Sequence, residues 1–191
     1  MRKTWTIVFA ILAVTLFVQG TAHALAISTH KAINLHIAKT AMNGFSLDEY
    51  LKNNLDATGG IGESYNGRRV EGWLELGGEY EDIPYLYMPY LRSVNHYHNP
   101  LTDRGFSGIF GTGFLQGMSA VDWTLLPMRT QSPGGYYSWA DARNYYYLAL
   151  TSYDKTARES HFADTFRGLG QLMHLVQDMS VPEHARDDGH V

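Results

Sequence analysis

The sequence predicts an all-α protein in which amphipathic helices are joined by long irregular connections. In several segments apolar residues recur every three or four positions, which is the spacing of a helix with one buried face. Residues 83–114, in the middle of the chain, are rich in glycine, proline and aromatic residues and lack the two-residue alternation of strands. With 191 residues, the chain is long enough for one domain with a substantial core.

The amino terminus, residues 1–24, has the layout of a secretory signal peptide. Basic Arg2 and Lys3 precede an apolar run at residues 7–18, and a small-x-small sequence ends at Ala24. The alternative is an uncleaved membrane anchor, but the run is shorter than the roughly 20 residues that span a bilayer. We therefore expect cleavage after Ala24 and export to the periplasm or the extracellular space.

The mature domain would comprise residues 25–191. Loss of the two positive charges of the leader changes the formal net charge from −4 to −6. Such an acidic surface is unsuited to tracking a polyanion, although bound cations would supply local positive charge to a phosphoesterase. The chain has no cysteine, so an exported domain must be held together by its core, by bound metal or by both.

The first predicted helix of the mature domain covers residues 28–42. Ser28 or Thr29 would cap its amino terminus, and Gly44 would end it. Three apolar residues have the spacing of one helix face, namely Ile33, Ile37 and Ala41.

Three further segments complete the first half of the domain. Residues 46–55 form a second predicted helix, with Ser46 as N-cap and an acidic residue three positions later. Residues 57–67 are rich in glycine and are expected to form a loop. Residues 70–82 predict a short helix that stops before the glycine pair at positions 77–78.

The second half of the domain contains the two strongest helix signals. Residues 138–152 form a helix that Ser138 caps, with Asp141 at the third helical position. Residues 158–179 form the longest helix, which ends before Pro182. Its apolar stripe comprises Phe162, Phe166, Leu169, Met173 and Val176.

The longest helix carries a second, polar face away from that stripe. His174 and Asp178 lie one turn apart on it, and two small residues, Ala163 and Gly170, precede them. Small side chains let another backbone approach closely. We therefore expect this helix to be buried on both sides.

The pair of His174 and Asp178 has the spacing of a two-ligand metal unit, because side chains at i and i+4 point the same way. On its own the pair is a weak signal, and a surface ion pair or a cap is the alternative interpretation. The signal is stronger here because Pro182 turns the chain and can bring His184 back towards the pair.

The stretch GQLMHLVQDMSVPEHA resembles the His-x3-Asp-x5-His signature of the zinc-dependent phospholipase C and fungal single-strand-specific nuclease superfamily. Members of that superfamily are all-helical exported enzymes that hydrolyse phosphoesters at a three-zinc cluster. The resemblance implies a helical domain of this type over residues 25–191. It also implies that His174 and Asp178 serve a pair of zinc ions and that His184 serves the remaining ion.

The superfamily also has an aspartate about fourteen or fifteen residues before a histidine, both bound to one zinc of the pair. Asp82 stands 14 residues before His96 and matches that spacing. The neighbouring Glu81 and His98 are rival ligands, since His96 and His98 would share one side of an extended segment. The spacing and the NHYHNP context favour Asp82 and His96, with a turn-capping role as the alternative for Asp82.

The superfamily further binds zinc through the mature amino terminus and a nearby histidine. Cleavage after Ala24 makes Leu25 the first residue and His30 the sixth, which matches the nuclease branch. The first residue of the superfamily is usually tryptophan, but the amine and the carbonyl of Leu25 are backbone groups and remain available. A surface histidine at a helix start is the alternative for His30.

The third zinc site departs from the superfamily pattern. After His184 the pattern has another histidine, followed four residues later by Glu or Asp. His190 matches that histidine, but its acidic partner would fall at about position 194, past the last residue. Asp187 and Asp188 are nearby carboxylates, but with the following glycine they first indicate a polar turn. We expect either a fragment that lacks its last helices or an incomplete third zinc site, and we favour the fragment.

The resemblance implies an exported zinc-dependent phosphodiester hydrolase with up to three Zn²⁺ ions. Metal-activated water would be the nucleophile, and Asp82 would accept its proton. A phospholipid head group and a nucleic acid are the candidate substrates, the acidic domain favours the lipid, and no stable macromolecular partner is implied. The alternatives are a single-strand nuclease, a non-catalytic exported metal-binding helical domain, and a plain helical bundle with incidental histidines.

Overall fold

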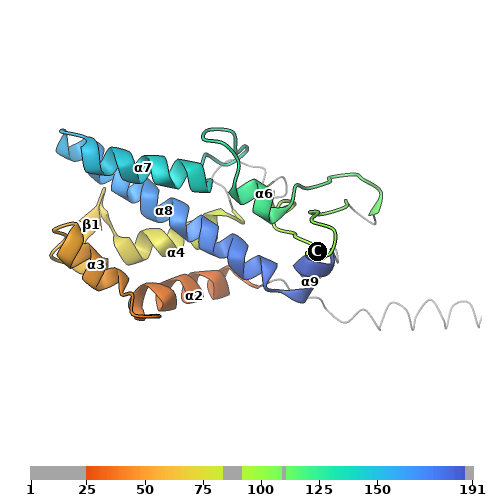
Figure 1. Ribbon diagram of the computed structural model, residues 1–191, viewed down its shortest axis with the longest axis horizontal. Helices are drawn as coiled ribbons and strands as arrows, with labels where there is room; N and C mark the ends of the chain where they lie inside the picture. The colour runs from red at the N-terminus through yellow and green to blue at the C-terminus, as the bar shows by residue number, and fades with distance from the viewer. Residues whose placement is uncertain (1–24, 84–91, 109–110, 188–191) are drawn as a thin grey trace, which may run out of the picture.

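The computed structural model describes residues 25–83, 92–108 and 111–187, and these are mostly helical (Figure 1). The all-α class expected from the sequence is therefore confirmed. The helices are α2 (Ile27–Lys39), α3 (Leu47–Asn54), α4 (Val70–Tyr80), α6 (Ala120–Thr124), α7 (Trp139–Thr151), α8 (Lys155–Met179) and α9 (Pro182–Arg186), with a 3-10 turn η1 (Gly60–Gly62). Two short antiparallel strands, β1 (Ser64–Tyr65) and β2 (Arg68–Arg69), form a hairpin between η1 and α4.

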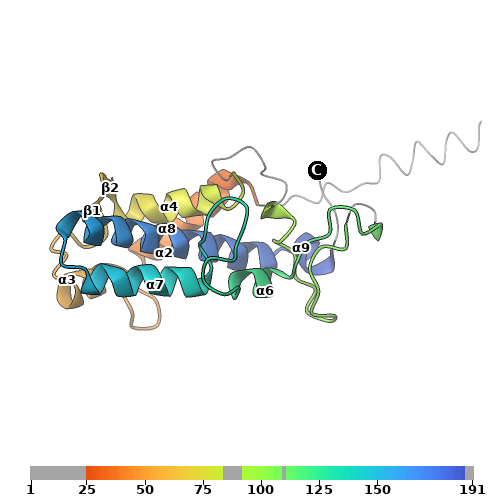
Figure 2. The same ribbon diagram turned by 90° about the horizontal axis from the view of Figure 1, so that it is seen from above.

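Helix α8 is the central element of the fold. It packs against α4 and α7, and α2 packs against α4 and the carboxyl-terminal part of α8 (Figure 1, Figure 2). The amino end of α2 and the carboxyl ends of α4 and α8 gather at the same end of the molecule, next to α9 (Figure 1). The elements that carry the expected metal ligands therefore converge.

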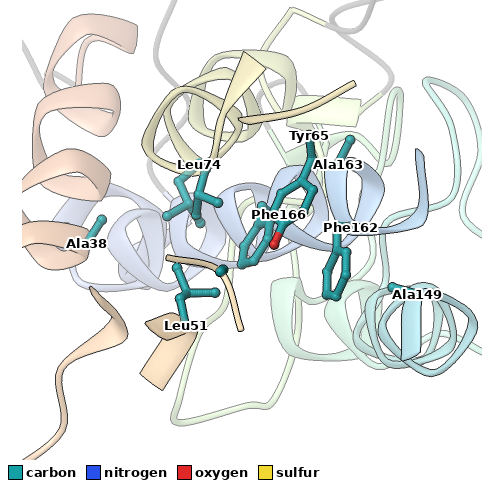
Figure 3. Close-up of a cluster of buried hydrophobic side chains, with 10 residues drawn as sticks. Ala38, Leu51, Tyr65, Leu74, Ala149, Phe162, Ala163 and Phe166 are labelled. Carbon is teal, nitrogen blue, oxygen red and sulfur yellow. The ribbon is translucent and has the colours of Figure 1, made fainter. Parts of the chain in front are cut away.

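The apolar core lies around the amino-terminal half of α8. Phe162 and Phe166 stack on Tyr65 with ring centroids 4.7 and 6.1 Å apart, and Leu51 and Leu74 close the cluster from α3 and α4 (Figure 3). Full burial of one such side chain contributes about 1.5–3 kcal/mol to folding. The core leaves the carboxyl-terminal half of α8 free to bury polar side chains.

The expected stop of α4 before its glycine pair is wrong, because the helix continues through both glycines to Tyr80. A Cβ atom on Gly77 would lie 2.2 Å from the Arg167 carbonyl oxygen, and one on Gly170 would lie 2.3 Å from the Leu74 carbonyl oxygen. These two glycines let the backbones of α4 and α8 touch, which offsets the roughly 1 kcal/mol that each costs in a helix. The expectation that α8 is buried on both sides is confirmed.

Side chains cap the starts of α3, α7 and α8, and the first two of these starts agree with the sequence. The Ser46 hydroxyl accepts the Glu49 N–H at 3.3 Å, and Ser138 and Asp141 form a reciprocal capping box on α7. Helix α8 begins at Lys155, three residues before its expected start, because the Asp154 side chain accepts the Ala157 N–H. Side-chain caps therefore set these starts.

Other expectations fail where no side-chain cap is used. Helix α2 starts after Ala26, which makes no side-chain cap, so neither Ser28 nor Thr29 is the N-cap. It ends at Lys39 rather than at position 42.

The buried stripe on α8 is also shorter than expected, because Val176 is 61% exposed.

Residues 57–67, expected to be a loop, contain η1 and β1. An Asn-Gly turn with positive φ angles at both residues (49° and 78°) closes the hairpin. The expected signal peptide, residues 1–24, lies outside the described residues. Within the ranges described, no helix has both the length and the apolarity needed to cross a membrane.

Candidate metal centre

Four histidines surround one buried carboxylate at the end of the molecule where α2, α4 and α8 converge. His30 comes from α2, His96 from the segment that follows residue 92, His174 and Asp178 from α8, and His184 from α9. Each of the five residues is at most 3% exposed. A buried group of this kind must satisfy its polar atoms internally or with a bound ion.

The Asp178 carboxylate is the centre of the cluster, and each of its oxygens faces two rings. Oδ2 lies 2.7 Å from His96 Nδ1 and 3.0 Å from His174 Nε2. Oδ1 lies 3.2 Å from His30 Nε2 and 3.6 Å from His184 Nδ1. A carboxylate with donors on both oxygens has the arrangement needed to bridge two cations.

Asp82 adds a second carboxylate on one side of this cluster. Its Oδ1 lies 3.6 Å from His96 Nδ1 and 3.6 Å from His174 Nε2. In two groups, His30 with Asp82 and His174, and His96 with His174 and Asp178, the candidate ligand atoms lie within 4.8 Å of one another. The Asp82 side chain is 25% exposed, so it is the carboxylate of the group that reaches solvent.

The electrostatics of the cluster favour an ionised Asp178 and positive charge beside it. Burial opposes ionisation of Asp178, but the His174, His30 and His96 rings in contact with it outweigh burial and hold the pKa of that carboxyl far below its ordinary value. Burial likewise opposes protonation of His96, but contacts with Asp178 and Glu81 raise its pKa to about 10. Protons thus supply the positive charge that a metal ion would supply when bound.

The structure separates Asp82 from its rival Glu81. The Glu81 carboxylate is fully buried, lies 2.8 Å from Arg92 Nη2 and accepts the Trp123 indole N–H at 3.0 Å. Burial opposes ionisation of Glu81, but the charge of Arg92 and the nearby His96 ring lower its pKa to about 2. Glu81 Oε1 lies 3.7 Å from His96 Nε2, the ring nitrogen that points away from Asp178. Glu81 is therefore placed to orient the His96 ring rather than to join the cluster.

The structure also separates His96 from its rival His98. His98 Nδ1 lies 2.9 Å from the Ser119 hydroxyl, and its backbone N–H donates to the His184 carbonyl at 3.1 Å. His98 therefore ties α9 to the loop that carries His96, and it is His96 that enters the cluster.

Two buried atoms test whether a metal fits. His174 Nε2 and Asp178 Oδ1 are inaccessible to solvent and make no hydrogen bond of acceptable geometry to the described residues, although they lie among the rings and carboxylates above. An unsatisfied buried polar atom costs about 1–3 kcal/mol. Imidazole nitrogens and carboxylate oxygens at this spacing could hold a transition-metal ion, and zinc is one of the metals that take such ligands.

Four other residues were singled out from the sequence, and the structure describes two of them. Leu25 is half-buried and precedes Ala26, the N-cap of α2, whose carbonyl accepts the His30 N–H at 3.2 Å. Asp187 is used elsewhere, because its carboxylate accepts the Ser107 N–H at 3.0 and 3.1 Å. His190 and Asp188 lie outside the described residues.

The sequence did not reveal the groups that contact the Nδ1 atoms of His174 and His30, on the side of each ring away from Asp178. His174 Nδ1 donates to the Gly78 carbonyl at 2.7 Å, and His30 Nδ1 lies 3.0 Å from Gln177 Oε1. Asn34 in turn contacts Gln177. The one available signal was the helical spacing of Asn34 from His30, which places both on one face of α2.

Comparison of the chain with protein-family models, with curated proteins and with solved structures gives no match. The site is therefore interpreted from its own geometry and chemistry.

Proposed function

We propose that this chain is an exported zinc-dependent hydrolase of phosphodiester bonds, of the kind that its resemblance to phospholipase C and single-strand nucleases implies. The observation that carries the proposal is the Asp178 carboxylate, which has histidine nitrogens on both oxygens and a second carboxylate, Asp82, beside the same rings. A carboxylate shared by two ions would keep them close enough to act together on the attacking and leaving oxygens of a phosphodiester.

The ligands divide into two sets about Asp178. Asp82, His96 and His174 would hold one ion with Asp178 Oδ2, and His30 would hold a second with Asp178 Oδ1 and the backbone of Leu25. Zinc bound there would supply Lewis acidity, which lowers the pKa of water and offsets the charge of a phosphoryl group.

Asp82 is the residue best placed to move a proton. Its carboxylate is partly exposed while Asp178 is buried, so it can accept a proton from water on the open side of the cluster. Asp178 would instead remain ionised, because its contacts with three histidine rings hold its pKa far below the ordinary value. The two carboxylates thus have separate roles.

A third ion would use His184 and His190. His184 Nδ1 already lies 3.6 Å from Asp178 Oδ1, close to the other rings. Its aromatic neighbour Tyr97, with ring centroids 4.5 Å apart, holds the His184 ring from the other side.

A second candidate is a non-catalytic metal-binding domain, and the depth of the cluster favours it. Structural metal sites are closed, whereas catalytic sites keep an open coordination position. Asp82 is the one partly exposed carboxylate around the cluster in the described residues, so an open coordination position would lie on its side.

Activity of the purified chain separates the two candidates. The assay follows hydrolysis of bis(p-nitrophenyl) phosphate, phosphatidylcholine and single-stranded DNA before and after treatment with a zinc chelator. Turnover that disappears with the chelator and returns with added Zn²⁺ supports the hydrolase, and the preferred substrate identifies the lipid or nucleic-acid branch. Zinc binding without turnover of any of the three supports the non-catalytic domain.

A further inference from the structure

A chain of buried amides runs from the crossing of α4 and α8 to the ring of His30. Asn34 Nδ2 donates to the Leu74 carbonyl at 2.9 Å and to the Gly170 carbonyl at 3.0 Å. Gln177 Nε2 donates to Asn34 Oδ1 at 2.7 Å, and Gln177 Oε1 lies 3.0 Å from His30 Nδ1. Asn34 and His30 are at most 1% exposed and Gln177 is 8% exposed, so water does not compete for these bonds.

The direction of every bond in this chain follows from its starting point. A backbone carbonyl can only accept, so Asn34 must turn its NH₂ group towards Leu74 and Gly170 and its oxygen towards Gln177. Gln177 must then donate to that oxygen, which turns its own oxygen towards His30. That oxygen can only accept, so His30 Nδ1 must carry a hydrogen.

The hydrogen on Nδ1 determines what the other ring nitrogen of His30, Nε2, can do. With Nδ1 occupied by its hydrogen, Nε2 is the one His30 nitrogen that can bind a cation, and it lies 3.2 Å from Asp178 Oδ1. We infer that Asn34 and Gln177 are positioning residues that fix the tautomer and the orientation of His30 for metal binding through Nε2. The metal part of this inference rests on the function proposed above.

The series of buried amides starts from a rigid position, because the two carbonyls that Asn34 binds belong to the backbones of helices α4 and α8. Gly77 and Gly170 bring α4 and α8 into contact at the carbonyls that Asn34 binds. The His30 ring also stacks on the His174 ring, with centroids 3.6 Å apart and planes 19° from parallel. The helix crossing therefore determines where Nε2 points.

His174 provides an internal comparison. Its Nδ1 donates directly to the Gly78 carbonyl, so its tautomer does not depend on any side chain. Loss of Gln177 should therefore disturb His30 and leave His174 in its tautomer.

The test compares Gln177→Met, which removes the acceptor for His30 Nδ1, with Gln177→Glu, which keeps an oxygen there. Gln171→Met is the matched control, since Gln171 is also a buried glutamine of α8 and its side chain makes no hydrogen bond to the described residues. Zinc affinity is measured by chelator competition, and the His30 tautomer is measured by ¹⁵N NMR of the ring nitrogens in metal-free protein.

We expect the wild-type spectrum to show a protonated His30 Nδ1. Gln177→Met should lose that signature and bind zinc roughly 10- to 100-fold more weakly, as other groups that orient metal-bound histidines do. Gln177→Glu should keep the signature even if its buried charge lowers the melting temperature, and Gln171→Met should match the wild type in both readouts.

Two results would overturn the inference: an unprotonated Nδ1 with a protonated Nε2 in the wild type, or wild-type zinc affinity in a folded Gln177→Met protein. The NMR readout needs no metal, so it is independent of the proposed function. Absence of zinc uptake by the wild type would remove the proposed function and the metal-positioning role together, whereas the wrong tautomer with normal zinc uptake would remove this inference alone.

Discussion

Asp178 Oδ2 lies 2.7 Å from His96 Nδ1, although Asp178 is on the last turn of α8 and His96 is in the long irregular middle of the chain. The contact fixes where the middle segment meets the helical bundle. It also places a ring on the side of the carboxylate opposite His30, which lies 3.2 Å from Oδ1. The proposed metal chemistry depends on this arrangement.

Replacement of Asp178 by asparagine should weaken zinc binding by more than about 100-fold. The neutral amide has a single oxygen, whereas the carboxylate has two, and each of these faces two histidine rings. Chelator competition measures the change. Asp164→Asn is the matched control, since Asp164 is on the same helix but accepts from the Tyr137 hydroxyl at 3.4 Å. Equal zinc affinity in the Asp178 variant and this control would contradict the bridging role.

Asp82→Asn should reduce kcat for phosphodiester hydrolysis by about 100-fold or more, because it removes the proposed proton acceptor. The free energy of unfolding should change by less than about 1 kcal/mol, since the side chain is partly exposed. Steady-state kinetics and urea unfolding give the two values. Glu79→Gln, which breaks a partly exposed ion pair with Lys31, should leave kcat unchanged. An Asp82→Asn variant with wild-type kcat would exclude the proton-transfer role.

Gly77→Ala should destabilise the protein by about 2–3 kcal/mol or more, because its Cβ would overlap the Arg167 carbonyl oxygen of α8. The midpoint of urea unfolding reports this loss. Gly62→Ala is the control, since a Cβ there meets nothing within 4 Å, and its effect should stay within about 0.5 kcal/mol. A tolerated Gly77→Ala would show that α4 and α8 do not touch at this position.

Arg92→Met should cost about 3–5 kcal/mol, because it leaves the Glu81 carboxylate buried without its partner. The double variant Glu81→Leu with Arg92→Met should recover much of that stability, since neither charge of the Glu81–Arg92 pair then remains buried. Lys52→Met, at an exposed ion pair with Asp48, should change the free energy of unfolding by less than about 1 kcal/mol. If the double variant is less stable than Arg92→Met alone, the loss does not come from an unpaired charge.

Much of the ligand set could be expected from the sequence because each part had a local signal. His174 and Asp178 share a helix face by their spacing, and Pro182 begins α9 so that His184 returns towards them. Asp82 and His96 were expected because their separation of 14 residues matches the superfamily that the sequence resembles. In the structure Asp82 contacts His174, and His96 contacts Asp178.

The supporting groups could not be expected, because they depend on how helices cross. Asn34 on α2 meets Gln177 on α8 beside the crossing at which Gly77 and Gly170 let the backbones of α4 and α8 touch. The same contact explains why the glycines do not stop α4, since tertiary packing outweighs their weak helix propensity. The choice between Glu81 and Asp82 likewise depended on Arg92, which buries one carboxylate and leaves the other to the cluster.

The metal content of the purified protein tests whether Asp178 joins a pair of zinc ions. After dialysis against metal-free buffer, mass spectrometry of the bound elements should find about two zinc ions per wild-type chain, because histidine rings face both oxygens of Asp178. His174→Ala, which removes a ring in contact with both Asp82 and Asp178, should lose most of that zinc. A folded wild-type chain without zinc, or His174→Ala with unchanged zinc, would contradict the account.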